Sequence, residues 1–122
     1  MEIIDFNVNG EKCGLLFNLT AYIDICEHFG GIDEMFAELD NEGNTLSHFL
    51  RLAAALMKGA KAYAKLNGEE LPAYTFEELA AICAPYDFGE IRNKVFEAMS
   101  GKANVEIEGS DSKNAKATMG AT

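Results

Sequence analysis

The stretch LSHFLRLAAALMKGAKAYAKL, residues 46–66, decides the fold, because its pattern predicts one long helix. Its apolar side chains recur at steps of three and four residues, so at about 100° per residue they share one side of the helix. The cations gather on the other side and form a basic stripe, made of Arg51, Lys58, Lys61 and Lys65. Since the apolar side must be buried, we expect the other elements to pack around this helix.

The amino-terminal residues predict a β-hairpin over residues 2–17. Two apolar runs, EIIDFNV and EKCGLLF, flank the pair Asn9-Gly10, and both residues tolerate the positive φ of a type I′ turn. A two-residue loop fixes the register, which pairs Val8 with Glu11, Phe6 with Cys13, and Ile4 with Leu15. Two strands alone are marginal in water, so the hairpin must pack on the helices or accept strands from another copy.

Four further helices are predicted over residues 19–29, 33–39, 76–84 and 88–100. The first has Asn18 or Thr20 as its possible N-cap, stops at Gly30, and carries an apolar stripe made of Leu19, Tyr22, Ile23, Cys26 and Phe29. The helix over residues 76–84 should begin at the capping box of Thr75 and Glu78 and end at Ala84, before Pro85. A second capping box, Asp87 with Glu90, should open the last helix.

The fold class expected from these elements is mainly α. A hairpin followed by about five helices, packed around the long central one, would form a single domain over residues 1–101. Residues 102–122 are rich in Lys, Asn, Ser, Gly, Asp and Thr without a helical period, so we expect a flexible, disordered tail.

The net charge of −10 is concentrated in the folded part. Residues 24–42 hold seven acids and no Lys or Arg. Such a surface repels phosphate and attracts basic proteins, so we expect no nucleic-acid partner, although a solvated face that keeps the protein in solution is the plainer explanation. The longest apolar run, residues 52–57, is far shorter than the roughly 20 residues that span a bilayer, and the start MEIID lacks a basic signal segment. We therefore expect neither a membrane span nor secretion.

The sequence offers no recognisable catalytic or cofactor motif. Neither a phosphate-binding glycine loop nor a nucleophile elbow occurs, and His28 beside Cys26 has no second pair at zinc-ligand spacing. The three cysteines, with no C-x-x-C pair, suit reduced side chains. We therefore expect a protein without metal or cofactor that is not an enzyme.

The order of these parts resembles the tail assembly chaperones of long-tailed (siphovirus-type) phages and prophages. The similarity spans about residues 1–101: a hairpin, then a helix led by Phe17-Asn18-Leu19 that ends with Glu27 and Gly30, then a long helix and two short ones. The T-x-E-E pattern at Thr75 and the I-x-x-x-V pattern at Ile91 also match.

The resemblance implies a function in phage tail assembly, in the cytoplasm of the bacterial host. A chaperone of this family binds the tape measure protein, keeps it soluble, self-associates and is left out of the mature virion. It is often accompanied by a longer form made by ribosomal frameshifting. Two alternatives stay open: a structural virion protein, such as a head–tail connector or tail tube component, and a small acidic regulator that binds a basic nucleic-acid-binding site.

Two sets of residues are candidates for protein contacts. The first set is apolar and offers contact with a partner, unless it belongs to the core: Met35, Phe36, Leu39 and Phe96. The second is the basic stripe, which could join copies of the chain by binding the acidic run of residues 24–42, or could pair with that run inside one chain.

Overall fold

The structure is a computed structural model that describes residues 2–39 and 45–100, and it is mainly helical with an amino-terminal hairpin, as predicted. Its elements follow in the order β1 (Ile4–Val8), β2 (Glu11–Leu15), α1 (Leu19–Phe29), α2 (Ile32–Leu39), α3 (Thr45–Leu66), α4 (Phe76–Ile82), the short 3-10 helix η2 (Pro85–Asp87) and α5 (Phe88–Ser100). The tail predicted over residues 102–122 lies outside the described residues.

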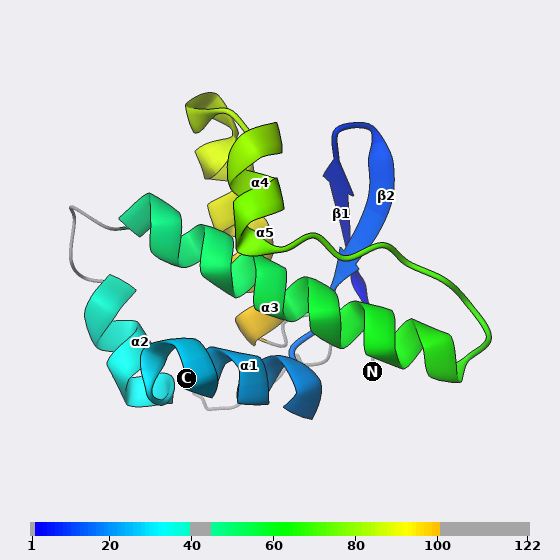
Figure 1. Cartoon of the computed structure of the whole chain (residues 1–122), viewed down its shortest axis with the longest axis horizontal. Coiled ribbons are helices and arrows are strands. Elements are labelled where there is room, and N and C mark those ends of the chain that lie inside the picture. Colours follow the sequence, from blue (N-terminus) through cyan, green and yellow to red (C-terminus); the bar gives the residue numbers. More distant parts are fainter. Residues whose placement is uncertain (1, 40–44, 101–122) are drawn as a thin grey trace.

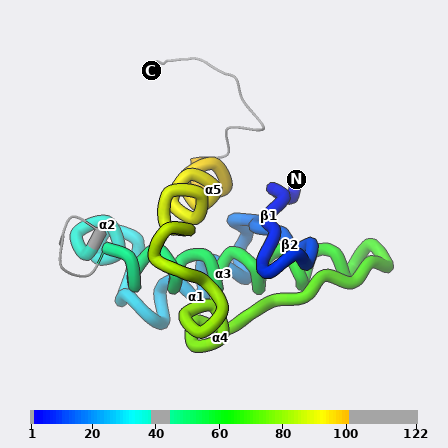
Figure 2. The backbone as a smooth tube through the Cα atoms, turned by 90° about the horizontal axis from the view of Figure 1, so that it is seen from above, coloured from blue at the N-terminus to red at the C-terminus, as the bar shows by residue number. Residues whose placement is uncertain are grey.

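Helix α3 forms the centre of the fold, with the other elements around it (Figure 1). It contacts α1, α2, α4, α5 and β2. Seen from above, α4 lies on one side of α3 and α5 on the other (Figure 2). Because partners approach from several directions, α3 buries more than the predicted side: Leu52, Ala54 and Ala55 are buried in addition to the predicted core positions such as Leu56 and Met57.

The hairpin has the predicted register. Asn9 and Gly10 take positive φ values of 54° and 80°, which suit the tight turn. The pairs are Val8 with Glu11, Phe6 with Cys13, and Ile4 with Leu15. All the apolar members of these pairs are buried, so the hairpin is held by its packing on the helices.

Several predicted helix ends are confirmed by their hydrogen bonds. The Asn18 side chain accepts the Ala21 N–H at 3.1 Å and caps α1, and Gly30 ends that helix at a φ of 91°. At α4, the Glu78 N–H donates to the Thr75 hydroxyl at 3.1 Å, and the Thr75 N–H donates to the Glu78 carboxylate at 2.9 Å. These are the two reciprocal bonds of a capping box.

The predictions around Pro85 were wrong in two details. Helix α4 ends at Ile82 rather than Ala84, because Cys83 and Ala84 both take extended backbone before the proline. The Asp87 carboxylate accepts the Ala84 N–H at 2.8 Å, so it closes the turn of η2 instead of capping α5. Helices α2 and α3 each begin one residue earlier than predicted.

Candidate functional site

Helix α1 turns most of its apolar stripe to the solvent. An amphipathic surface helix ordinarily buries this stripe. In α1, Leu19 is 75% exposed, Tyr22 40% and Ile23 56%, while Cys26 is half-buried. We call these four residues the outward face. The buried side of the helix instead holds Ala21, Ile25 and, unusually, the carboxylate of Asp24.

The orientation of α1 is set where the chain leaves β2. The Leu16 N–H donates to the Leu56 carbonyl of α3 at 3.0 Å, and the Asn18 amide donates to the Gly59 carbonyl at 3.0 Å. Gly59 permits this close approach, because a Cβ there would collide with the Leu16 carbonyl oxygen and with Asn18 Oδ1. The first turn of α1 is therefore fixed against the middle of α3.

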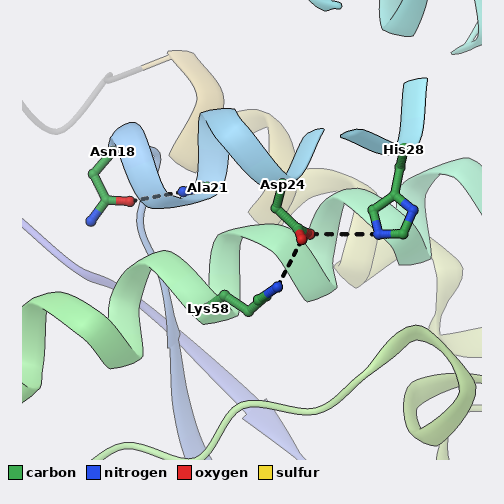
Figure 3. Close-up of polar contacts among 5 residues, drawn as sticks. All are labelled: Asn18, Ala21, Asp24, His28 and Lys58. Carbon is green, nitrogen blue, oxygen red and sulfur yellow. Dashed lines mark hydrogen bonds and ion pairs between the residues drawn. The ribbon is translucent and has the colours of Figure 1, made fainter. Parts of the chain in front are cut away.

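An ion pair between the buried Asp24 carboxylate and the exposed Lys58 fixes the next turn of α1. Lys58 Nζ of α3 donates to Asp24 Oδ1 at 2.8 Å, and His28 Nε2 lies 3.9 Å from Asp24 Oδ2 (Figure 3). A buried carboxylate needs such a partner, since an unpaired buried charge is strongly destabilising. Rotating the apolar stripe inward would carry Asp24 away from Lys58, so this contact opposes the ordinary orientation of the helix.

Acidic side chains lie beside the outward face. Glu27 is exposed one turn beyond Ile23, on the same side of α1. Asp33 is exposed in the first turn of α2, which packs on α1, and Cys26, followed by burial and the Asp33 carboxylate, raises the pKa of the Tyr22 hydroxyl. No Lys or Arg occurs in residues 13–50. Acidic side chains therefore lie beside the outward face, and the exposed Lys58 that reaches α1 is paired with Asp24.

The residues proposed for partner contact lie in different environments. Met35 belongs to the core, which was the open alternative for this set, because it is fully buried where α2 packs on α1 and α3. Phe36 is 52% exposed on α2, and Phe96 is 48% exposed while its ring packs edge-on against Phe49 at 5.4 Å between centroids. Leu39 ends α2, and its side chain lies outside the described structure.

The basic stripe is divided between different contacts. The Arg51 guanidinium stacks over the Phe76 ring of α4, 4.0 Å from its centroid, and Lys58 is paired with Asp24. Lys61 and Lys65 remain exposed near the loop of residues 69–72. The pairing of Lys58 with Asp24 is the intramolecular alternative to self-association, whereas self-association itself stays a prediction.

Within residues 2–39 and 45–100, no three His, Cys, Asp or Glu side chains converge as metal ligands, and no helix there is long and apolar enough to cross a membrane. Burial raises the pKa of the Cys13 and Cys83 thiols, which is the opposite of what an activated nucleophile needs. Comparisons of the chain with protein-family models, curated proteins and solved structures find no match. The functional argument therefore depends on the residues themselves.

Sequence reasoning did not single out Leu19, Tyr22 and Ile23 as surface residues, because periodicity marks an apolar stripe without saying where it points. One signal was available. Gly59 interrupts a helix otherwise rich in Ala and Leu, and an isolated glycine inside a helix often marks the close approach of another segment. That signal locates the contact on α3 but does not identify Asn18 as its partner.

Proposed function

We propose that this chain is a phage tail assembly chaperone that binds the tape measure protein and keeps it soluble. The observation that supports this most is the outward face of α1, where Leu19, Tyr22 and Ile23 are exposed next to acidic side chains. Contiguous exposed apolar side chains on a soluble domain mark a site of protein interaction. The resemblance in the order of hairpin and helices points to the tape measure protein as the partner.

The charge of the chain suits a protein that holds an aggregation-prone client. A net charge of −10 makes copies of the chain repel one another at long range, while the exposed apolar groups attract a client at short range. A complex that keeps surplus negative charge on its outside stays in solution. The exposed Phe36 and Phe96 offer further apolar contact, so several segments of a long client could be covered.

Co-expression tests the proposal. The full chain should be produced together with the tape measure protein of the same phage or prophage genome, and the amount of tape measure protein measured in the soluble and insoluble fractions. We expect the client to be soluble and to co-purify with the chain, and to be insoluble when it is produced alone. A client that stays insoluble in the presence of excess chain would contradict the proposal.

The protein content of purified phage particles distinguishes a chaperone from a virion protein. A chaperone leaves the tail after assembly, so mass spectrometry of particles should find the tape measure protein without this chain. Detecting the chain at a stoichiometric level would favour a connector or tail tube subunit instead. The same measurement on infected cells would show whether a longer, frameshifted product accompanies the chain.

A further inference from the structure

We propose that the outward face of α1 binds one amphipathic helix of the partner, whose apolar stripe is flanked by Lys or Arg. This deepens the proposed function by naming the site and the chemistry of its occupant. It depends on that function only in requiring a protein partner, and any partner with such a helix would satisfy it.

The geometry of the outward face favours a helix as the occupant. Leu19, Tyr22, Ile23 and Cys26 follow the spacing i, i+3, i+4 and i+7, which forms a ridge about 10 Å long on a helix surface. A ridge of this kind packs into the groove between the rows of side chains on a second helix. Amphipathic helices bind their targets through anchors at this same spacing.

The acids beside the ridge select for cations on the partner. Glu27 is exposed one turn beyond Ile23, and Asp33 is exposed in the first turn of α2, which packs on α1. The nearest part of the sequence, residues 13–50, supplies no Lys or Arg to neutralise them. A helix with cations on both sides of its apolar stripe would place them opposite these carboxylates, as flanking charges do in coiled coils.

The same charges disfavour a second copy of this face. Two copies packed stripe to stripe about a twofold axis would bring Glu27 and Asp33 of one copy close to the acids of the other. Like charges close together at an interface oppose binding. Lys58, the cation that contacts α1, does not offset this repulsion fully, because it already pairs with Asp24.

The test uses the full-length chain labelled for nuclear magnetic resonance and a designed helical peptide of Leu and Lys about 18 residues long. The control peptide keeps the same Leu stripe and carries Glu in place of Lys. We expect the Leu–Lys peptide to shift the amide signals of residues 19–27 most strongly and the Leu–Glu peptide to shift none of them. Raising the salt concentration should weaken the binding, because the flanking charges are exposed.

Matched variants distinguish apolar binding at the outward face from general attraction between the basic peptide and the acidic chain. Ile23→Ser keeps every charge and should weaken peptide binding about tenfold or more, as loss of an interface anchor does. The control is Leu66→Ser, which removes a similarly apolar and even more exposed side chain at the far end of α3 and should leave the affinity unchanged. Glu27→Gln should weaken binding less and reduce its salt dependence.

Four results would overturn the inference. The first is that Ile23→Ser and Leu66→Ser bind the peptide with equal affinity, and the second is that the peptide shifts amide signals mainly outside α1. The third is that signals in α1 shift with rising protein concentration in the absence of peptide. The fourth is that Ile23→Ser changes the signals of residues 102–122 in the absence of peptide. The third would assign the face to a second copy, and the fourth to the chain's own carboxyl-terminal segment. If the peptide binds at α1 but the tape measure protein stays insoluble in co-expression, the proposed function fails and the inference stands.

Discussion

The hairpin and α1 are neighbours in the chain, yet their sequence patterns relate to the structure in opposite ways. In the hairpin, the alternation of apolar residues and the Asn9-Gly10 turn predict the register, and the buried side chains are the expected ones. In α1, the cap and stop residues predict the ends of the helix, but its apolar stripe faces the solvent. The bounds of both elements follow from local sequence, whereas the direction in which α1 faces does not.

The difference teaches where the information for orientation lies. A hairpin pairs residues that are close in sequence, so its turn alone decides which side chains share a face. Helix α1 is oriented by contacts with residues more than 30 positions away, namely Asn18 with Gly59 and Asp24 with Lys58. Substitutions at Ile25, Gly59 and Lys58 test whether these distant contacts, rather than the apolar stripe, hold α1 in place, and a substitution at Tyr74 tests the hairpin.

The largest difference in stability is expected between alanine substitutions of two isoleucines of α1, Ile25 and Ile23. Ile25 is fully buried, so Ile25→Ala should lower the free energy of unfolding by about 2–5 kcal/mol through lost apolar contact and a new cavity. Ile23 is largely exposed, so Ile23→Ala should cost less than about 1 kcal/mol. Urea unfolding of both variants measures the difference. Equal losses would mean that α1 buries its stripe after all.

The second effect concerns the close approach at Gly59. A glycine in the middle of a helix normally costs about 1 kcal/mol relative to alanine, so Gly→Ala is usually stabilising there. At Gly59 the added methyl group would press on the Leu16 carbonyl oxygen and on Asn18 Oδ1, and we expect a net loss of about 1–3 kcal/mol.

Gly89 provides the matched control for this prediction. It also lies in a helix, α5, and a Cβ there would meet no atom within 4 Å. Gly89→Ala should therefore leave the stability unchanged or raise it by up to about 1 kcal/mol. Gly59→Ala should lower the melting temperature and Gly89→Ala should not, and a rise for Gly59→Ala would show that α1 is not fixed by this contact.

These contacts show how far sequence reasoning could reach. Caps, turns and periodicity are local, and they predicted the five helices, the hairpin register and the ends of α1. The candidate surface was missed because it depends on a buried carboxylate, Asp24, and on a cation 34 positions later in the sequence, Lys58. The sequence around each of these residues does not indicate its partner. The choice between core and surface stayed open for Met35 for a related reason, since helical spacing alone could not distinguish it from the exposed Phe36.

A third prediction tests the ion pair between α1 and α3. Lys58→Met leaves the buried Asp24 carboxylate without its closest cation, so it should lower the stability by about 1–2 kcal/mol, a range reduced because Lys58 is itself exposed. Asp24→Asn removes the buried charge and leaves an exposed lysine that water can solvate, so it should cost less. Equilibrium unfolding at neutral pH measures both. The opposite order would mean that water, rather than Lys58, already satisfies Asp24.

The smallest loss of stability is expected when the hairpin loses its contact with Tyr74, because the structure of the hairpin is set by local sequence. The Tyr74 hydroxyl donates to the Glu11 carboxylate at the start of β2, and this bond raises the pKa of Tyr74 from its usual 10.0 to about 12. The folded protein thus holds the phenolic proton to a higher pH than the unfolded chain does. The stabilisation is complete below about pH 10 and is lost as the pH rises towards about 12.

Tyr74→Phe removes the hydroxyl while keeping the ring, so it isolates this hydrogen bond. The variant should be slightly less stable than the parent chain at neutral pH, and the gap should close as the pH rises from about 10 to about 12. The titration of tyrosinate absorbance should lose the component near pH 12. Because Asn9-Gly10 and the buried pairs set the register locally, the cross-strand contacts of β1 and β2 should persist in the variant's amide spectra. A gap that widens above pH 10 would contradict the assigned bond, and a lost register would show that the hairpin, like α1, depends on distant contacts.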